Sequence, residues 1–305
     1  MSNMPRKALI LGRNGQLARE LQRTVPEGFD VTVLGRAEID LLDMAQVADT
    51  FGTVEPDLVI NAAAYTAVDQ AETDREAAFA LNATAVANIA DAVNGRDGTA
   101  LVHVSTDFVF DGKKSSPYTA NDSTNPLSVY GESKLAGEFE ILTRNLPEAL
   151  ILRTSWVYAS HGNNFVKTML RLMADPARDQ LSVVADQIGT PTWAYSLAKS
   201  IWQAGISRLN SEEARGTEIF NWTDAGVASW YDFAVAVQEL ALQRGLLTRK
   251  IAINPIPHTA YPTPAARPTF SVLDKSTFAQ AYGVQPVHWR EQLGSMLQEL
   301  ATEVN

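Results

Sequence analysis

Cysteine is absent from the 305 residues of this chain. No disulfide, thiolate nucleophile or cysteine metal site can therefore form, and the compartment cannot be read from redox chemistry. The chain also has no apolar run approaching the roughly 18 residues of a membrane span, and residues 1–7 lack the hydrophobic region of a signal peptide. We therefore expect a cytoplasmic protein with no membrane partner.

Positive charge is scarce: 25 lysines and arginines stand against 35 aspartates and glutamates, so the formal charge is −10. This balance argues against a nucleic acid or an anionic membrane surface as the main partner. With 46% hydrophobic residues the chain can bury a large core. No repeat or low-complexity linker divides it, and we expect one large α/β domain interleaved with a smaller one.

The first segment with a chemical signature follows a short apolar run at residues 7–11. The run stops at Gly12-Arg13-Asn14-Gly15-Gln16-Leu17-Ala18, after which Leu17, Leu21 and Val25 recur at helical spacing. The pattern predicts a strand, a glycine turn and a helix, whose positive end meets a pyrophosphate in dinucleotide-binding folds. A glycine fragment alone is a weak signal, but directly after an N-terminal strand it favours a dinucleotide site.

The next predicted strand, residues 31–34, bears on the choice of cofactor. It ends in Gly35-Arg36 instead of the acidic residue that binds an NAD ribose. Arg36, joined by Arg13, is able to pair with a 2′-phosphate, so the sequence favours NADPH, with NADH possible; the alternative is two solvated arginines. Asp40-Leu41 follows, either flanking an adenine or with Asp40 as a helix cap.

A third strand, residues 58–60, runs into Asn61-Ala62-Ala63-Ala64-Tyr65-Thr66. Small side chains at the carboxyl end of a strand leave room for a ligand, although alanines also serve close helix packing. We expect one long helix over residues 72–94. Asn82 lies within it among apolar and small residues, which is typical of a satisfied core polar group.

A fourth strand, residues 100–104, runs into Ser105-Thr106-Asp107. Hydroxyl groups at this edge of a parallel sheet lie where substrates bind, and Thr106 is placed to donate a hydrogen bond to a substrate carbonyl. His103, between two valines, is interpreted as a core residue. Residues 111–125 are polar and predict a surface loop.

Tyr130 and Lys134 follow that loop, four residues apart at the start of a predicted helix, so they share one face. A cation held near a phenol oxygen favours the phenolate and lowers the pKa of the tyrosine, which makes it a usable proton donor and acceptor. An isolated pair of this kind more often lies on a solvated helix face, so the remaining motifs must decide.

Those motifs carry a family resemblance. The glycine turn, the alanine-rich strand end, Ser105-Thr106-Asp107 and the Tyr130/Lys134 pair occur in the order found in extended short-chain dehydrogenase/reductases. More narrowly, the chain resembles the dTDP-4-dehydrorhamnose reductases. The narrower resemblance lies in Gly15-Gln16-Leu17, Ala63-Ala64-Tyr65-Thr66-Ala67-Val68-Asp69, Val129 to Glu138, Arg153-Thr154-Ser155-Trp156-Val157-Tyr158, Gly162-Asn163-Asn164-Phe165, Asp186-Gln187-Ile188-Gly189-Thr190-Pro191-Thr192 and Ala260 to Pro268.

The resemblance implies a Rossmann-type doubly wound parallel sheet with a smaller α/β substrate-binding lobe. We expect the NAD(P)-binding domain at residues 1–155, with return segments at about 186–220, and the lobe mainly at 156–305. The implied activity is hydride transfer from NAD(P)H to the C4 ketone of dTDP-4-dehydro-L-rhamnose, giving dTDP-L-rhamnose. The implied partner is thus a small sugar nucleotide, and the chain is expected to be a monomer or homodimer.

Roles carry over residue by residue. Tyr130 is the implied proton donor, Lys134 lowers its pKa and holds the nicotinamide ribose, and Thr106 orients the carbonyl. The implied substrate contacts are Thr106, Asp107, Trp156, Asn164 and Arg267, the last in a proline-rich loop and assigned to the diphosphate. The implied cofactor contacts are Gly12, Arg13, Asn14, Gly15, Gln16, Leu17, Arg36, Asp40, Leu41, Ala62, Ala63, Ala64, Tyr65, Asn82, Ser105, Tyr130 and Lys134.

Two positions depart from the family pattern. Phe108 stands where the family usually has tyrosine, so a hydroxyl contact is lost, and Ala18 replaces the third glycine of the turn, a position that mainly serves helix packing. Some members dimerise through a magnesium site of acidic residues; Glu20 and Glu299 correspond, but Tyr195 replaces another carboxylate, so we predict no metal. Two alternatives remain: another sugar-nucleotide reductase or epimerase, and a non-catalytic NADP-binding regulatory subunit of the kind that accompanies methionine adenosyltransferase.

Overall fold

A six-stranded parallel sheet forms the centre of the computed structural model, which describes residues 4–304. Residues 1–3 of the N-terminal stretch lie outside the described part. The strand order is β10-β5-β4-β3-β1-β2, with neighbouring strands in parallel register throughout. The strands are β1 (Arg6–Leu11), β2 (Phe29–Leu34), β3 (Leu58–Asn61), β4 (Ala100–Thr106), β5 (Glu148–Thr154) and β10 (Gly216–Asn221). The predicted doubly wound sheet is confirmed.

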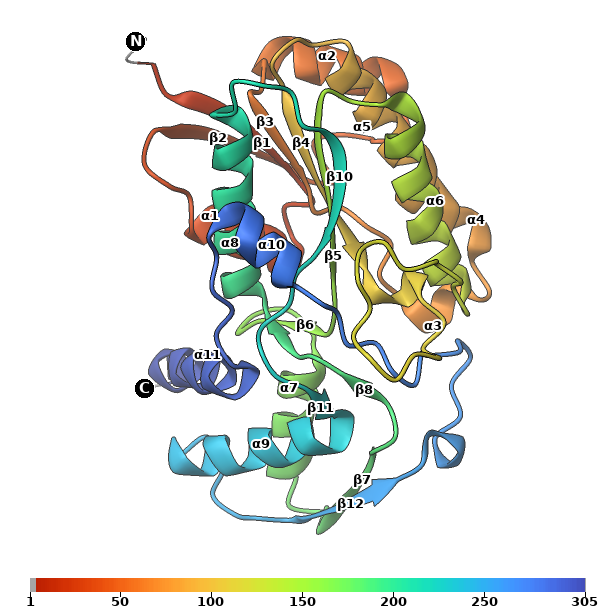
Figure 1. Ribbon diagram of the computed structural model, residues 1–305. Coiled ribbons are helices and arrows are strands. Elements are labelled where there is room, and N and C mark those ends of the chain that lie inside the picture. Colours follow the sequence, from red (N-terminus) through yellow and green to blue (C-terminus); the bar gives the residue numbers. More distant parts are fainter. Residues whose placement is uncertain (1–3, 305) are drawn as a thin grey trace.

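Helices cover both faces of the sheet (Figure 1). Alternate residues of one strand point to opposite faces, so Ala8 and Ile10 of β1 pack in one core and Leu9 and Leu11 in another. The first core is completed by α1 (Gln16–Arg23), α8 (Ala194–Leu209) and α10 (Ser276–Tyr282), the second by α2 (Met44–Val54), α5 (Ala85–Asn94) and α6 (Val129–Arg144). Strands buried on both faces explain the continuous apolar runs in the sequence.

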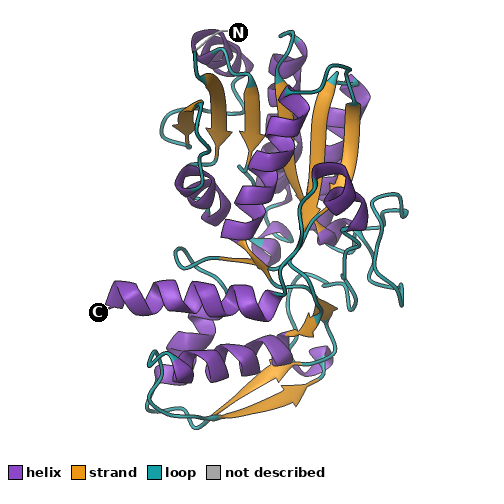
Figure 2. Ribbon diagram, turned by 60° about the vertical axis from the view of Figure 1, so that its left-hand side comes forward, coloured by secondary structure: helices purple, strands orange, loops and turns teal. Residues whose placement is uncertain are grey.

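A second unit with its own core follows β5 and lies below the sheet in Figures 1 and 2. Its helices are α7 (Phe165–Ala174), α9 (Trp230–Gln243) and α11 (Trp289–Val304). Its short strands pair as β6 (Val157–Tyr158) with β9 (Thr192–Trp193), β7 (Gln180–Val184) with β12 (Ala252–Ile256), and β8 (Ile188–Gly189) with β11 (Ala228–Ser229). Because α8 and β10 return to the sheet between these elements, the two units are interleaved.

The long helix predicted over residues 72–94 is confirmed from Arg75 onward, but it is not a regular α-helix throughout. After the short α3 (Val68–Ala71), the structure has α4 (Arg75–Phe79), a π-helical turn (Ala80–Thr84) and then α5 without a break. The extra residue of a π-turn rotates the side chains that follow it. Here the π-turn carries the buried Asn82. A Cβ on Gly137 of α6 would approach the backbone carbonyl oxygen of Asn82 to 2.1 Å.

Hydrogen-bonding side chains set several helix starts. Ser229 caps α9 in a reciprocal capping box with Asp232. Asp43 caps α2, accepting from the Ala45 and Gln46 N–H groups, so the alternative of Asp40 as the helix cap is wrong. Asp40 instead accepts the N–H of Leu42 within the preceding turn.

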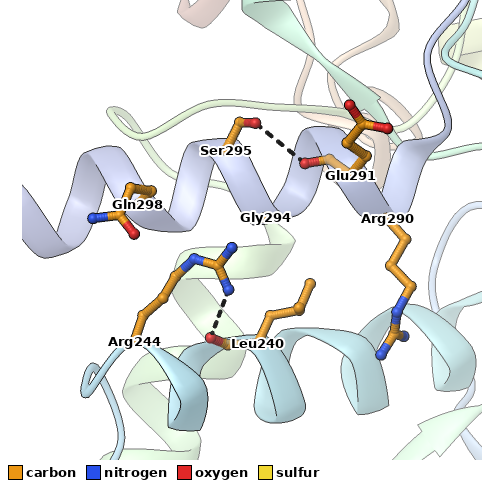
Figure 3. Close-up of a pocket in the computed structure, with 7 residues that line it drawn as sticks. All are labelled: Leu240, Arg244, Arg290, Glu291, Gly294, Ser295 and Gln298. Carbon is orange, nitrogen blue, oxygen red and sulfur yellow. Dashed lines mark hydrogen bonds between the residues drawn. The ribbon is translucent and has the colours of Figure 1, made fainter.

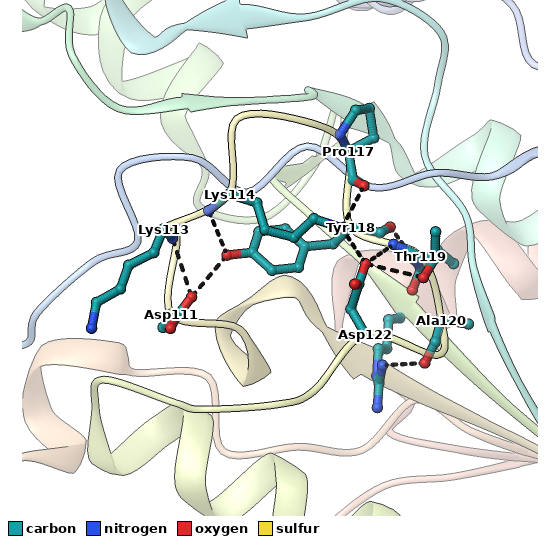
Figure 4. A network of polar contacts seen from close by, with 10 residues as sticks. Asp111, Lys113, Lys114, Pro117, Tyr118, Thr119, Ala120 and Asp122 are labelled. Atoms are coloured by element: carbon teal, nitrogen blue, oxygen red, sulfur yellow. Dashed lines mark hydrogen bonds and ion pairs between the residues drawn. The ribbon is translucent and has the colours of Figure 1, made fainter.

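The predicted surface loop, residues 111–125, is packed more tightly than its polarity indicates (Figure 4). Tyr118 is 2% exposed, and its hydroxyl donates to Asp111 over 2.9 Å. The Lys114 ammonium pairs with Asp122 at 2.6 Å. Backbone hydrogen bonds from Tyr118 to Val272 and from Asp274 to Tyr118 join this loop to the C-terminal segment.

Within the described part of the chain, no helix has the length and apolarity needed to cross a membrane.

Candidate active site

The glycine turn lies at the topological switch point, between β1 and β3, where doubly wound folds bind ligands. Gly12 has φ +108, and a Cβ there would approach the Ala62 carbonyl and the Ala63 nitrogen to 2.9 Å. Only glycine therefore lets the two strand ends meet this closely. Gly15 begins α1 without any side-chain cap, so the first N–H groups of the helix remain available to an anion. This cradle suits a pyrophosphate.

Gln16 fastens that turn to the second unit. Its side-chain oxygen accepts from the Asn164 amide at 2.8 Å, and its backbone carbonyl lies 3.1 Å from Nε2 of His161. Asn164 also caps α7, accepting the Lys167 N–H and donating to Ala159. The amide of Asn164 is thus used in fixing the cleft, and its role as a direct substrate contact stays a prediction. Asn14 and Leu17 lie on the same turn and first helical residues.

The carboxyl end of β2 carries the expected arginines. Arg13 donates to the Val33 carbonyl at 2.6 Å and pairs with Glu38 at 3.0 Å, while Glu38 also accepts the Gly35 N–H. Arg36 is exposed beside them. The Glu38 carboxylate therefore lies near this edge, two residues after Arg36. Of the expected adenine neighbours, Asp40 is exposed and Leu41 is buried in the core.

Ala62, Ala63 and Ala64 follow β3 and are partly exposed at the switch point. Asn82 holds the next residue, accepting the Tyr65 N–H at 2.8 Å and donating to the Tyr65 carbonyl and to Ser133 of α6. The interpretation of Asn82 as a satisfied core polar group is confirmed. Its amide is used within the protein, so any contribution to cofactor binding runs through the position of Tyr65.

Thr106 and Tyr130 come together because α6 starts unusually close to β4. Ser128 caps the helix, and a Cβ on Gly131 would approach the Phe108 carbonyl to 2.3 Å. The tyrosine ring packs edge-on against Phe108 with 5.5 Å between centroids, and its hydroxyl hydrogen-bonds Thr106. The glycine after the tyrosine therefore serves close approach, and the threonine and phenol face one site.

The pKa of Tyr130 is the reverse of the expectation. Its pKa is raised to about 12, mainly by burial and to a smaller extent by the Asp107 carboxylate, against the lowering effect of the Thr106 hydrogen bond. The reason is that the protein gives the phenol an apolar setting and a negative neighbour. Asp107 itself is 2% exposed, and burial raises its pKa to about 6 against hydrogen bonds from Ser271 and Thr106.

Lys134, one helical turn after the tyrosine, is buried and donates to the Val104 carbonyl at 2.7 Å. Burial lowers its pKa to about 8, while the Glu138 carboxylate opposes this shift. Glu138 is held by Arg153 at 2.6 Å and by the Ser105 hydroxyl at 2.5 Å. Because the Ser105 side chain bonds to Glu138, only its backbone remains for the cofactor contact that the resemblance implies.

Trp156 is held in a constrained pose between the two units. Its backbone has φ +49, a region that costs energy for any residue other than glycine. Its ring stacks on Trp230 with 3.5 Å between centroids and an interplanar angle of 5°. A Cβ on Gly189 would approach the indole to 2.6 Å. Trp230 was missed by the sequence argument because no motif adjoins it; only its place after the Ser229 cap marks it.

Arg267, the expected diphosphate ligand, pairs with Asp69 at 2.8 Å and donates to Thr263 at 2.6 Å. This contact ties the proline-rich loop to the segment after β3.

Glu20 and Glu299, the two acidic residues that correspond to the magnesium site of some family members, lie on either side of Arg23. The Arg23 guanidinium is 2.8 Å from Glu20 and 2.9 Å from Glu299, and it lies over the Tyr195 ring. A guanidinium therefore occupies the space between the two carboxylates, and the absence of a metal there stays a prediction.

A groove of about 520 Å³ lies elsewhere, between α9 and α11 (Figure 3). It contains none of the predicted site residues. Its lining is Leu240, Arg244, Arg290, Glu291, Gly294, Ser295 and Gln298. The chemistry of the molecule therefore concentrates at the carboxyl edge of the sheet and not in this groove.

Proteins that combine a dinucleotide turn at this switch point with a tyrosine and lysine one helical turn apart beside it are short-chain dehydrogenase/reductases. The second unit after β5 places the chain in their extended class. The family model described as RmlD substrate binding domain matches residues 6–302. The chain belongs to the dTDP-4-dehydrorhamnose reductase family.

Individual relatives agree over nearly the whole length. The dTDP-4-dehydrorhamnose reductase of Escherichia coli strain K12 is 42% identical over 299 residues, covering 96% of this chain and 98% of that protein. A crystal structure of such a reductase from Clostridium acetobutylicum has TM-score 0.87 at 36% identity, covering 96% and 99%. One from Bacillus anthracis, in complex with NADP, has TM-score 0.88 at 33% identity, covering 97% and 100%.

Proposed function

We propose that this chain is an NADPH-dependent reductase that converts the C4 ketone of dTDP-4-dehydro-L-rhamnose into the alcohol of dTDP-L-rhamnose. The observation that carries the proposal is the meeting of Thr106, Tyr130 and Lys134 at the sheet edge that also holds the Gly12 turn. The named activity of relatives about 40% identical supports the substrate. The NADP complex of a relative supports the cofactor.

The residues around the ketone have different roles in the reaction. When bound, the nicotinamide cofactor supplies the hydride. Tyr130 donates a proton to the carbonyl oxygen, and a pKa near 12 keeps the phenol protonated at neutral pH. Thr106 orients the same oxygen. The Lys134 ammonium stabilises the phenolate left after transfer, which compensates for the unfavourable effect of burial and of Asp107 on that anion.

Groups on the other side of the cleft are suited to the sugar nucleotide. Oδ2 of Asp107 is buried and makes no hydrogen bond within the described part of the chain, so it is an acceptor for a sugar hydroxyl. Trp156 offers the edge of a fixed aromatic stack. Arg267 exchanges one of its carboxylate contacts for the diphosphate, since a guanidinium binds both in the same bidentate geometry.

Turnover of dTDP-4-dehydro-L-rhamnose, generated by a dehydratase and an epimerase and followed by NADPH absorbance, tests this function. Tyr130→Phe should lower kcat by about 10²–10⁴-fold with cofactor affinity nearly unchanged, because the proton donor is removed and the ring kept. Tyr282→Phe is the matched control. It removes a buried hydroxyl that accepts from Arg208 on α8, so it should affect stability and not turnover.

Unchanged turnover in Tyr130→Phe would refute the assigned proton donor. Binding of NADPH by the wild type without oxidation, across this and other 4-keto sugar nucleotides, would refute the reductase and favour a regulatory subunit. Oxidation with a different sugar nucleotide alone would keep the reaction class and change the substrate.

A further inference from the structure

The side-chain nitrogen of Lys134 contacts a histidine that the proposed mechanism does not use. His103 lies on β4 and is completely buried. Its Nε2 lies 3.3 Å from Nζ of Lys134, which also donates to the Val104 carbonyl at 2.7 Å. The sequence interpretation of His103 as a core residue therefore describes its burial but not its neighbour.

Asn61 determines which imidazole nitrogen carries the proton. Its Oδ1 accepts the backbone N–H of Ala63 at 3.1 Å, so the Nδ2 group faces Nδ1 of His103 at 3.0 Å. An amide N–H can only be matched by a lone pair, so Nδ1 must be unprotonated. The neutral ring then carries its hydrogen on Nε2.

That hydrogen points at Lys134. An ammonium has three donors and no acceptor, whereas a neutral amine has a lone pair that accepts from Nε2. The fixed tautomer therefore favours the amine over the ammonium. We propose that His103, held by Asn61, is a positioning residue that controls when Lys134 carries its proton. The inference rests on the proposed function for its consequence in catalysis, but its geometry stands without it.

Other charges around Lys134 act in the opposite direction or are neutralised. Glu138, one turn on in α6, favours the ammonium, but Arg153 of β5 pairs with it at 2.6 Å. Asp107 lies on the tyrosine side of the site, where it acts on Tyr130. The pKa of His103 is held well below its ordinary value by burial and by Lys134, so the ring stays neutral over the working pH range.

The chain of contacts has a functional consequence. It begins at the Ala63 N–H, beside Gly12 at the cofactor edge, and ends at the lysine that supports the phenolate. Since the pKa of Lys134 is lowered to about 8, the ammonium is present below that pH and lost as pH rises through it. Activity should therefore decline on the alkaline side near pH 8, where the ammonium is lost.

Nitrogen-15 NMR of histidine-labelled full-length protein tests the tautomer directly, because the chain has only four histidines. The His103 signal is assigned by its loss in His103→Gln. We expect a neutral ring protonated at Nε2 from pH 5 to 9, with a change in the Nε2 shift as Lys134 titrates. A ring protonated at Nδ1, or an imidazolium at pH 6, would overturn the proposal without bearing on the reductase activity.

Two variants test the control of Lys134. Asn61→Asp offers an acceptor to Nδ1, which moves the ring proton there and leaves Nε2 free to accept from the ammonium. His103→Gln can turn its amide oxygen toward the ammonium. In both, the alkaline limb of kcat/KM should move up by about one pH unit, and so should the titration of Lys134 followed by NMR of labelled lysine in the free protein.

Thr99→Val is the matched control for a lost buried hydrogen bond. Thr99 precedes β4 and donates to the Pro56 carbonyl at 2.8 Å, at the opposite end of the strand. It should lower stability and leave the pH profile unchanged. An unmoved Lys134 titration in folded His103→Gln would refute the proposal. A moved titration in that variant, together with a wild type that does not turn over the sugar nucleotide, would retain the proposal and refute the proposed function.

Discussion

Arg36 is the exposed arginine at the edge where a 2′-phosphate is expected. Because Arg13 is engaged with Val33 and Glu38, Arg36 is the freer cation of the two. We predict that Arg36→Ala raises KM for NADPH by about tenfold or more, since a charge-assisted phosphate contact is lost, with little change for NADH. Steady-state kinetics with both cofactors provide the measurement.

Arg19→Ala, which removes the same charge from an exposed position on α1, is the control for a general electrostatic effect. Equal losses with NADPH and NADH in Arg36→Ala would contradict the 2′-phosphate contact. They would also direct attention to Glu38, the carboxylate that binds the Gly35 N–H at the same edge.

Single residues were predicted best where chemistry and spacing coincide. Tyr130 and Lys134 lie four apart on one helix, so their shared face follows from helical geometry. The environment of each did not follow. The rise in the pKa of Tyr130 depends on burial and on Asp107, and the contact of His103 with Lys134 joins β4 to α6. Such cross-element contacts have no local signature in the chain.

At the scale of elements, the small pair of β8 and β11 fixes the aromatic stack. Gly189 of β8 lies against the Trp156 indole, where a Cβ would approach to 2.6 Å, and the Trp230 ring stacks on the same indole. We predict that Gly189→Ala displaces Trp156 and raises KM for the sugar nucleotide about tenfold, with NADPH affinity unchanged. Substrate kinetics and NADPH titration separate the two effects.

Gly52→Ala in α2 is the glycine control, because nothing lies within 4 Å of the added Cβ. It should leave both constants unchanged and stabilise the protein by about 0.5–1 kcal/mol through helix propensity. A Gly189→Ala enzyme with normal KM would show that Trp156 can move without cost to substrate binding.

The first four strands of the sheet, β1 to β4, were predicted to within about two residues at each end because each is a short apolar run with glycine or polar residues after it. The segment between β3 and β4 was harder to predict. Val86, Ile89, Ala90 and Val93 recur at helical spacing and form one buried face of α5, whereas Phe79, at the same spacing, is only partly buried. The π-turn between them packs against Gly137 of α6. A 3.6-residue periodicity contains no information about such a partner.

The molecule as a whole interleaves its two units, which no linker in the sequence marks. The division near residue 155 into a cofactor domain and a substrate lobe stays a prediction. Separate hydrophobic cores lie around the sheet and among α7, α9 and α11. Asp224 lies where the chain leaves β10 and accepts the Trp193 N–H at the start of α8. It therefore joins the sheet to the second unit through a buried carboxyl.

Asp224 makes the stability of the whole molecule depend on pH. Burial raises its pKa to about 7, against hydrogen bonds from Ser196 and Trp193 and the nearby Lys275 ammonium. The folded protein thus holds this proton where the unfolded chain, with an ordinary pKa near 4, releases it. The sign follows: this contribution is present below about pH 4 and is lost as pH rises from about 4 to 7.

We therefore predict that Asp224→Asn reduces the loss of stability between pH 5 and 8 by on the order of a few kcal/mol, because the amide still accepts from Trp193 and carries no charge to bury. Urea denaturation at both pH values measures this. Asp30→Asn, at an exposed position of β2, changes the net charge equally and should leave the difference intact. A wild-type pH dependence retained in Asp224→Asn would mean that the buried carboxyl stays ionised beside Lys275, and that the joint between the two units is held by that ion pair.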